Sequence, residues 1–180
     1  PANVALQLRQ DTSFTAGCRL FNTPPNGMVP LPCILHVPMK PSTLRHGMNL
    51  WPPFLFAGIH VTEISPDWKR VRVELRMRPW NRNFVGTHFG GNLFAMTDPF
   101  RMIPVLQCLG RDYMVWDQAG SIEFVKPGRG TVYALFELDD AILDDLRRAA
   151  AGGDKVLRWF DTNVVDAQGE VVARVRKQVY

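Results

Sequence analysis

One short segment joins several residue types that could do chemistry, and a carboxylate follows it at a fixed distance. The segment runs from Asn83 to Gly91 and ends in two glycines, and Asp98 comes seven residues later. The glycines open an apolar stretch that we predict to be a helix, whose first N–H groups lack intrahelical partners. Such donors suit an oxyanion or a polarised carbonyl, and a nearby carboxylate can attack a carbonyl or activate water. This combination indicates acyl transfer.

The same residues carry a resemblance to a known superfamily. The spacing Asn-x3-Thr-x2-Gly-Gly, with Asp98 seven residues after the second glycine, resembles the PaaI-type acyl-CoA thioesterases of the hotdog superfamily. A longer match, over roughly residues 44–180, resembles an uncharacterised bacterial branch of that superfamily, a family of domains of unknown function. The matching segments are LRHGMNLWPPF, WNRNFVGTHFGGNLFAMTDPF, YMVWDQAGSIEFVKPGRGTV and VVDAQGEVVARVRKQVY.

The resemblance implies a role for each residue of the motif. Asp98 would be the nucleophile or general base, the Gly91 N–H the oxyanion donor, and Asn83 the group that positions the thioester carbonyl or the attacking water. The reaction would need no metal and no cofactor, because CoA is part of the acyl-CoA substrate. We expect further substrate contacts from residues of the motif and from loop cations that could meet the CoA phosphates, namely Thr87, His88, Phe89, Gly90, Arg82, Lys126 and Arg129.

Other interpretations of the same residues stay open. Pro99 follows Asp98 directly, so Asp98 could instead cap a second helical segment that begins after a kink. Asn83 could be a loop-capping residue. PaaI-type enzymes usually have histidine before the glycine pair, where this chain has Phe89, and that departure favours an alternative of another class, a non-catalytic acyl-thioester-binding module. A hotdog hydratase with an Asp-x4-His pair is disfavoured, because Ile103 stands at the histidine position.

Composition limits the classes of protein to be considered. The chain has 180 residues, of which 46% are hydrophobic, enough for one sizeable core. Three widely spaced cysteines without a CxxC pair argue against a zinc site or a disulfide scaffold and favour a reducing compartment. No apolar run is long enough to span a membrane, so we expect a cytoplasmic protein. The net charge is +4, but the basic residues are scattered and accompany no nucleic-acid-binding motif.

The element pattern predicts a proline-rich N-terminal arm over residues 1–43 and one domain over residues 44–180. Within the domain we expect a short helix in 42–55, a long buried helix over 91–109 and a polar-faced helix over 139–150, capped by Asp139 or Asp140. Strands are predicted over 59–64, 68–77, 113–125, 131–138, 156–165 and 170–179. One buried helix wrapped by an antiparallel sheet gives an α+β fold, the hotdog layout. The resemblance implies a homodimer, or a dimer of dimers, with the active site at the interface.

Asp117 is a charged residue in an otherwise apolar strand, where it follows Trp116. A carboxylate at such a position either faces solvent or is paired. We favour pairing with an arginine at an interface, with a second active-site acid as the alternative.

Overall fold

The computed structural model describes residues 39–180, and the predicted arm therefore lies outside the described residues except for its last five positions. The described part begins with α1 (Pro41–Leu50) and α2 (Pro52–Ala57). The pair Pro52-Pro53 lies just beyond the end of α1 and begins α2, so the region 42–55, where one short helix was expected, holds parts of two. Proline suits the first helical position because the N–H that it lacks would have no intrahelical acceptor there.

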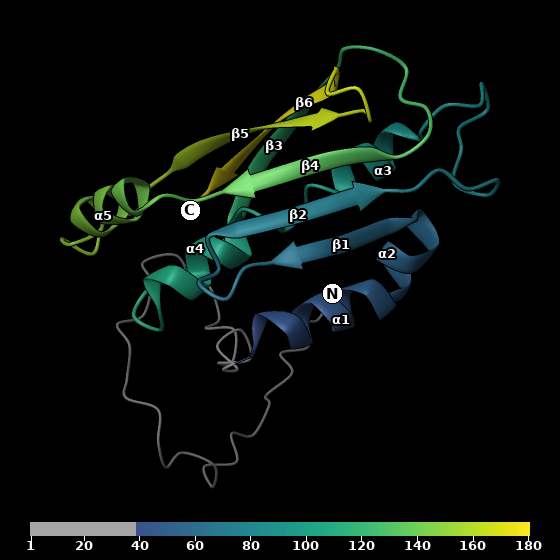
Figure 1. The fold of residues 1–180 in the computed structure, drawn as a ribbon. Coiled ribbons are helices and arrows are strands. Elements are labelled where there is room, and N and C mark those ends of the chain that lie inside the picture. Colours follow the sequence, from purple (N-terminus) through teal and green to yellow (C-terminus); the bar gives the residue numbers. More distant parts are fainter. Residues whose placement is uncertain (1–38) are drawn as a thin grey trace, which may run out of the picture. The chain divides into compact units, whose positions relative to one another are not determined.

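A six-stranded antiparallel sheet forms the body of the domain (Figure 1). The strands are β1 (Ile59–Ile64), β2 (Arg70–Leu75), β3 (Asp117–Phe124), β4 (Val132–Glu137), β5 (Arg158–Val165) and β6 (Val171–Val179), in the spatial order β1-β2-β4-β5-β6-β3. Residues on β2 alternate between exposed and buried, as the sequence predicts, and Val71 and Val73 pair with Phe136 and Ala134 of β4. The α+β hotdog class is confirmed.

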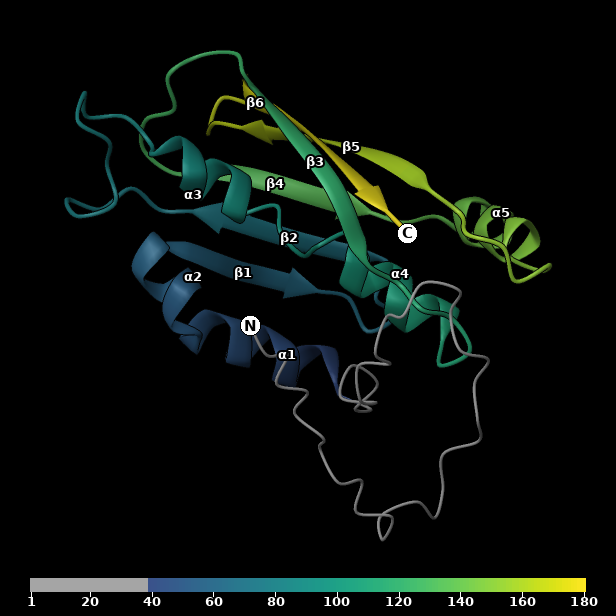
Figure 2. The same ribbon diagram turned by 180° about the vertical axis from the view of Figure 1, so that it is seen from behind.

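Two short helices, α3 (Gly90–Ala95) and α4 (Met102–Leu109), lie against one face of this sheet (Figure 2). Leu93 of α3, with Met96 and Phe100 from the segment that follows it, joins side chains of the sheet such as Val61 and Val73 in the main core. A second core lies where α4 meets α5 (Asp140–Ala149), and it includes Val105, Leu143 and Phe160.

The prediction of a single long helix over residues 91–109 is wrong in one respect, because the structure has two shorter helices there. The chain leaves helical geometry after Ala95, passes through a cis Asp98–Pro99 peptide bond and resumes a helix at Met102. Pro99 has no N–H to donate to the Ala95 carbonyl, which instead accepts a bond of 3.1 Å from the Asp98 N–H. Asp98 therefore lies in the break between two helices.

Arg101 ties this break to the sheet. Its guanidinium lies between the rings of Phe136 and Phe160 and donates to the carbonyls of Glu137 and Asp161, each at 2.8 Å. Burial lowers the pKa of Arg101 to about 10, against the opposing effect of Asp161 and Glu137.

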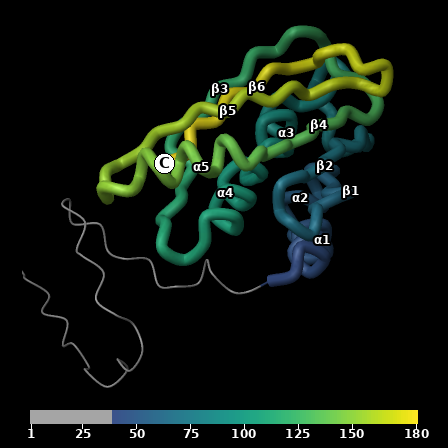
Figure 3. Tube along the Cα trace, turned by 60° about the vertical axis from the view of Figure 1, so that its left-hand side comes forward, coloured from purple at the N-terminus to yellow at the C-terminus, as the bar shows by residue number. Residues whose placement is uncertain are grey.

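The two edges of the sheet differ. Helix α1 runs beside β1 (Figure 3), and the Asn49 side chain bonds both the N–H and the carbonyl of Val61, at 2.7 and 3.0 Å. The opposite edge is β3, which pairs with β6 on one side and with no strand of residues 39–180 on the other. One edge is thus covered by the chain itself, while the other presents unpaired backbone groups.

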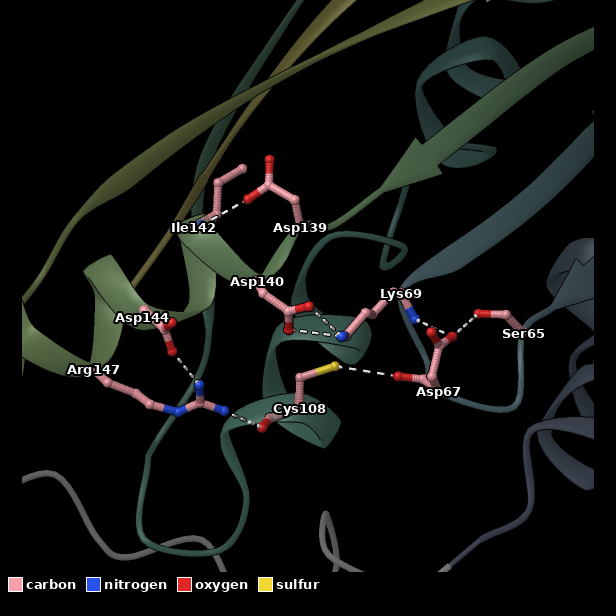
Figure 4. Close-up of polar contacts among 9 residues, drawn as sticks. All are labelled: Ser65, Asp67, Lys69, Cys108, Asp139, Asp140, Ile142, Asp144 and Arg147. Carbon is pink, nitrogen blue, oxygen red and sulfur yellow. Dashed lines mark hydrogen bonds and ion pairs between the residues drawn. The ribbon is translucent and has the colours of Figure 1, made fainter.

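A polar network at one end of the sheet fixes α5 (Figure 4). Asp139 caps α5 by accepting from the Ile142 N–H at 2.7 Å, which confirms the predicted cap. Lys69, next to β2, binds Asp140 at 2.6 Å, and Arg147 donates to the Cys108 carbonyl at 3.0 Å. These contacts join the β1–β2 turn, α4 and α5.

Candidate active site

One face of α3 lies along the open edge of the sheet. The residues on that face are Gly90, Phe94 and, past the end of the helix, Asp98, which are four residues apart. Gly90 touches the ring of Phe124 on β3, since an added Cβ would lie 2.8 Å from that ring. Phe94 in turn packs over Gly120, where an added Cβ would lie 2.8 Å from the Phe94 ring. Glycine at both positions lets the helix approach the strand closely.

The N-terminus of α3 presents backbone donors. Phe89 precedes the helix in an extended conformation, and its carbonyl accepts from the N–H groups of Asn92 and Leu93 at 3.0 and 3.2 Å. The N–H groups of Gly90 and Gly91 come before these first intrahelical donors and have no intrahelical partner. Gly91 is exposed, and the ring of Phe89 folds back against it so closely that a Cβ would collide with the ring.

Asn83 uses its side chain within the loop before α3. Its Oδ1 accepts from the N–H groups of Val85 and Thr87, at 3.1 and 2.9 Å, and its Nδ2 donates to the Thr87 hydroxyl at 2.7 Å. Both ends of the amide therefore bond groups of the loop. This is the loop-capping geometry that the sequence left open for Asn83.

His88 is buried, 3% exposed, and fastens this loop to the segment between β3 and β4. Its Nε2 lies 2.7 Å from the Gly130 carbonyl, so Nε2 carries the proton, and its backbone N–H donates to the Gly128 carbonyl at 3.0 Å. Nδ1 is buried without a partner among the described residues. Burial lowers the pKa of His88, which the bond to Gly130 only partly opposes.

Asp98 is held by a lysine from β6. Lys177 Nζ lies 2.5 Å from Asp98 Oδ1 and 4.5 Å from the centre of the Phe94 ring. The two partners differ in exposure, since the Asp98 side chain is 54% exposed and that of Lys177 only 9%. The carboxylate therefore reaches solvent while its cation comes from the interior.

Asp117 begins β3 near the same lysine. Its Oδ1 is buried and has no hydrogen-bond partner among residues 39–180, so the pairing with an arginine that we favoured is not seen within this part of the chain. Burial raises the pKa of Asp117, the Lys177 charge lowers it, and the Asp98 charge raises it again. Two carboxylates and one ammonium thus form a single electrostatic cluster.

The predicted CoA-binding cations are in different surroundings. Lys126 is bound to Asp166 at 2.6 Å and to Glu170, both near the β5–β6 turn. Arg129 is exposed in the segment between β3 and β4 to which His88 is bound, and Arg82 is exposed next to Asn83, where it forms an isolated bridge with His88. Among residues 39–180, no group of three or more His, Cys, Asp or Glu side chains is arranged to hold a metal ion. Nor does any helix of that range have the length and apolarity to cross a membrane.

The structure thus divides the predicted residues into two sets. Phe89, Gly90, Gly91 and Asp98 lie along α3, whereas Asn83, Thr87 and His88 build the loop that precedes it. Lys177 is a residue of this cluster that the motif spacing did not indicate. Its signal is the period of two in β6, which places Lys177 on the same face as the buried Val175 and Val179.

Comparisons with known proteins agree with this architecture. Residues 42–180 match the family model described as Domain of unknown function (DUF4442). A probable thioesterase of unknown function from Pseudomonas aeruginosa superposes with a TM-score of 0.68 at 20% identity, over 80% of this chain and 96% of that one. The PaaI protein of the E. coli phenylacetic acid degradation operon gives 0.54 at 19% identity, over 75% and 88%.

A thioesterase from Haemophilus influenzae gives a TM-score of 0.59 at 10% identity, over 78% of this chain and 89% of that one. No curated protein matches the sequence. At these identities the similarity establishes the fold.

Proposed function

The chain belongs to the DUF4442 family of domains of unknown function, and from this premise we propose that it hydrolyses a hydrophobic acyl-CoA thioester. The observation that carries the proposal is α3 itself, which has free backbone N–H groups at one end and the Asp98 carboxylate just past the other. Proteins of the same fold that are named thioesterases support it.

The proposed chemistry uses Asp98 and the Gly91 N–H. Asp98 takes a proton from water, whose oxygen attacks the thioester carbonyl carbon, and the Gly91 N–H donates to the developing oxyanion. The tetrahedral intermediate collapses by breaking the C–S bond, and CoA leaves as its thiolate. In the variant mechanism the Asp98 carboxylate attacks the thioester carbonyl carbon first, and the C–S bond breaks with release of CoA thiolate. Water then hydrolyses the resulting mixed anhydride, which releases the carboxylic acid and restores Asp98.

Within one protomer the two groups lie at opposite ends of α3. The four helical steps from Gly91 to Ala95 alone span about 6 Å, and Asp98 lies three residues beyond the end of α3. The Gly91 N–H also points out of the N-terminal end of α3, away from Asp98, because helical N–H groups point toward the N-terminus. The proposal therefore combines Gly91 of one protomer with Asp98 of its partner.

The open edge of β3 supports such a homodimer. If two β3 strands paired antiparallel about a two-fold axis, the α3 helices packed beside them would also run antiparallel. The N-terminus of each α3 would then approach the Asp98 end of the other. The β1 edge is unsuited to this pairing, because Asn49 already bonds the backbone groups of Val61.

Arg82 and Arg129 are the proposed contacts for the CoA phosphates. Both are exposed, and they flank the loop fastened by His88. Lys126 is the weaker candidate, since two carboxylates already neutralise its charge. Phe89 and Gly90 would line the acyl site, while Thr87 and His88 would act by holding the loop in place.

Release of free thiol from acyl-CoAs of short, long and aryl chains tests the function. Asp98→Ala and Asp98→Asn should each lower kcat by about 10²–10⁴-fold, the range of a lost general base. Asp154→Asn, a change at an exposed carboxylate in the α5–β5 connection, is the matched control and should leave kcat unaltered. Full activity in both Asp98 variants would remove Asp98 from the mechanism.

A binding module is the second candidate, and one observation favours it. Lys177 neutralises Asp98, which would suit a protein that holds a thioester without cleaving it. Saturable binding of acyl-CoA with no thiol release by the wild-type chain would establish this alternative.

A further inference from the structure

Lys177 is a buried cation on an apolar face. It lies on the same face of β6 as Val175 and Val179, and only 7% of the residue is exposed. Moving an ammonium out of water costs several kcal/mol unless opposite charge and hydrogen bonds replace its hydration. The chain therefore places counter-charges around it.

Three groups surround the Lys177 side chain. Asp98 accepts its hydrogen bond at 2.5 Å, and the Phe94 ring lies 4.5 Å from Nζ. Asp117 faces Val179, the next residue on the same face of β6, and interacts with Lys177 electrostatically. Gly120 faces Lys177 directly in the β3–β6 register, and an added Cβ there would lie 3.1 Å from Lys177 Cδ. The glycine leaves the space through which the lysine stem passes.

This pair differs from the ordinary surface pairs of the same strand. Arg174, also on β6, binds Glu123 of β3 at 3.2 Å, and both of those side chains are more than half exposed. Surface pairs of that kind contribute little and leave both side chains mobile. Lys177, by contrast, is fixed in the interior and fastens a carboxylate that reaches solvent.

We propose that Lys177 is a positioning residue for Asp98 and that Asp117 holds Lys177 in place from β3. By binding Oδ1, the ammonium fixes the Asp98 carboxylate in one orientation and leaves Oδ2, which has no hydrogen-bond partner among residues 39–180, toward the substrate. Asp117, which faces Val179 across the β3–β6 ladder, would act on the ammonium from the side of β3. This inference rests on the proposed function, because it assigns Lys177 to the reaction of Asp98.

Steady-state thiol release by the full chain tests the inference. Lys177→Met keeps the length of the side chain and removes the charge, and we expect kcat to fall about 10²-fold, as for a misplaced catalytic group, with KM changed less than about threefold. Lys177→Arg retains a cation and should recover most of the loss. Asp117→Asn should also lower kcat, by about tenfold. Arg174→Met is the matched control on the same strand and should not alter kcat.

Combining variants separates positioning from a general loss of structure. Once Asp98 is replaced by Asn, there is no carboxylate to position, so adding Lys177→Met should not lower the residual rate further. Wild-type kcat in Lys177→Met, with Asp98→Asn inactive, would overturn the inference and leave the proposed function standing. If Lys177→Met fails to fold, Lys177→Gln takes its place, and wild-type kcat in that uncharged variant would overturn the inference. Absence of thiol release from the wild-type chain would instead overturn the proposed function, and the inference with it.

Discussion

The buried ring of His88 makes the stability of the domain depend on pH. Burial lowers the pKa of His88, so the folded state binds a proton less readily than the unfolded chain does. The contribution of neutral His88 to the free energy of unfolding is therefore fully present above the pKa that His88 has in the unfolded chain, near 6.5. This contribution is lost as the pH falls below that value. Below this pH, each further unit lowers the free energy of unfolding by up to about 1.4 kcal/mol.

Urea unfolding at pH 8 and at pH 5 measures this effect. Between these values the free energy of unfolding should fall more in the wild-type chain than in His88→Gln, whose amide cannot take up the proton. At pH 8 the variant should be less stable, because it loses the bond to the Gly130 carbonyl. If the free energy of unfolding falls equally in the two proteins, His88 does not contribute to the loss of stability at low pH.

The motif residues show how far single positions could be predicted. Residue type and spacing were enough to single out Asn83, Gly91 and Asp98, but spacing along a chain cannot tell which partner a side chain chooses. Asn83 bonds its own loop, and Asp98 binds a lysine 79 positions away. The position of Lys177 on an apolar strand face can be read from the sequence, yet its partner depends on how β6 and the helix break meet in space.

At the scale of elements, Arg101 joins the helix break to the sheet. It donates to two backbone carbonyls and to the Thr162 hydroxyl, at 2.9 Å, while its guanidinium lies against two rings. Arg101→Met would keep much of the packing but leave these acceptors without donors. We expect the free energy of unfolding to fall by about 2–4 kcal/mol, measured by urea denaturation.

Arg148→Met provides the control for Arg101. Arg148 lies on α5, its side chain is 77% exposed, and it pairs with Asp145 at 3.4 Å. Loss of such a pair should change the free energy of unfolding by less than about 0.5 kcal/mol. Similar losses in the two variants would mean that the buried contacts of Arg101 contribute no more than a surface ion pair.

Periodicity predicted the strands better than the helices. Alternation in β2 and in the β5–β6 hairpin is a local property, and these elements lie close to their predicted bounds. The apolar stretch from Gly91 to Leu109 has helical composition throughout, so composition alone joined α3 to α4. Only Pro99 indicated the break, and the contacts of Arg101 that fix its geometry come from strands far along the chain.

At the scale of the whole molecule, the proposed site predicts complementation between two inactive chains. Asp98→Ala lacks the carboxylate, and Gly91→Pro lacks the backbone donor at a first-turn position where proline is tolerated. The Phe89 ring must move to admit the proline, and it can do so because it is 54% exposed. Each variant alone should form a folded but inactive homodimer.

A heterodimer of the two variants, isolated with a different tag on each chain, distinguishes the possible arrangements. If each site joins Gly91 of one protomer to Asp98 of its partner, one of the two sites contains both intact groups, and the other contains neither. The heterodimer should then release thiol at about half the wild-type rate per dimer. If each site lay within one protomer, every site would lack one group and the heterodimer would be inactive. Because α3 directs its free N–H groups away from Asp98, we expect the first result.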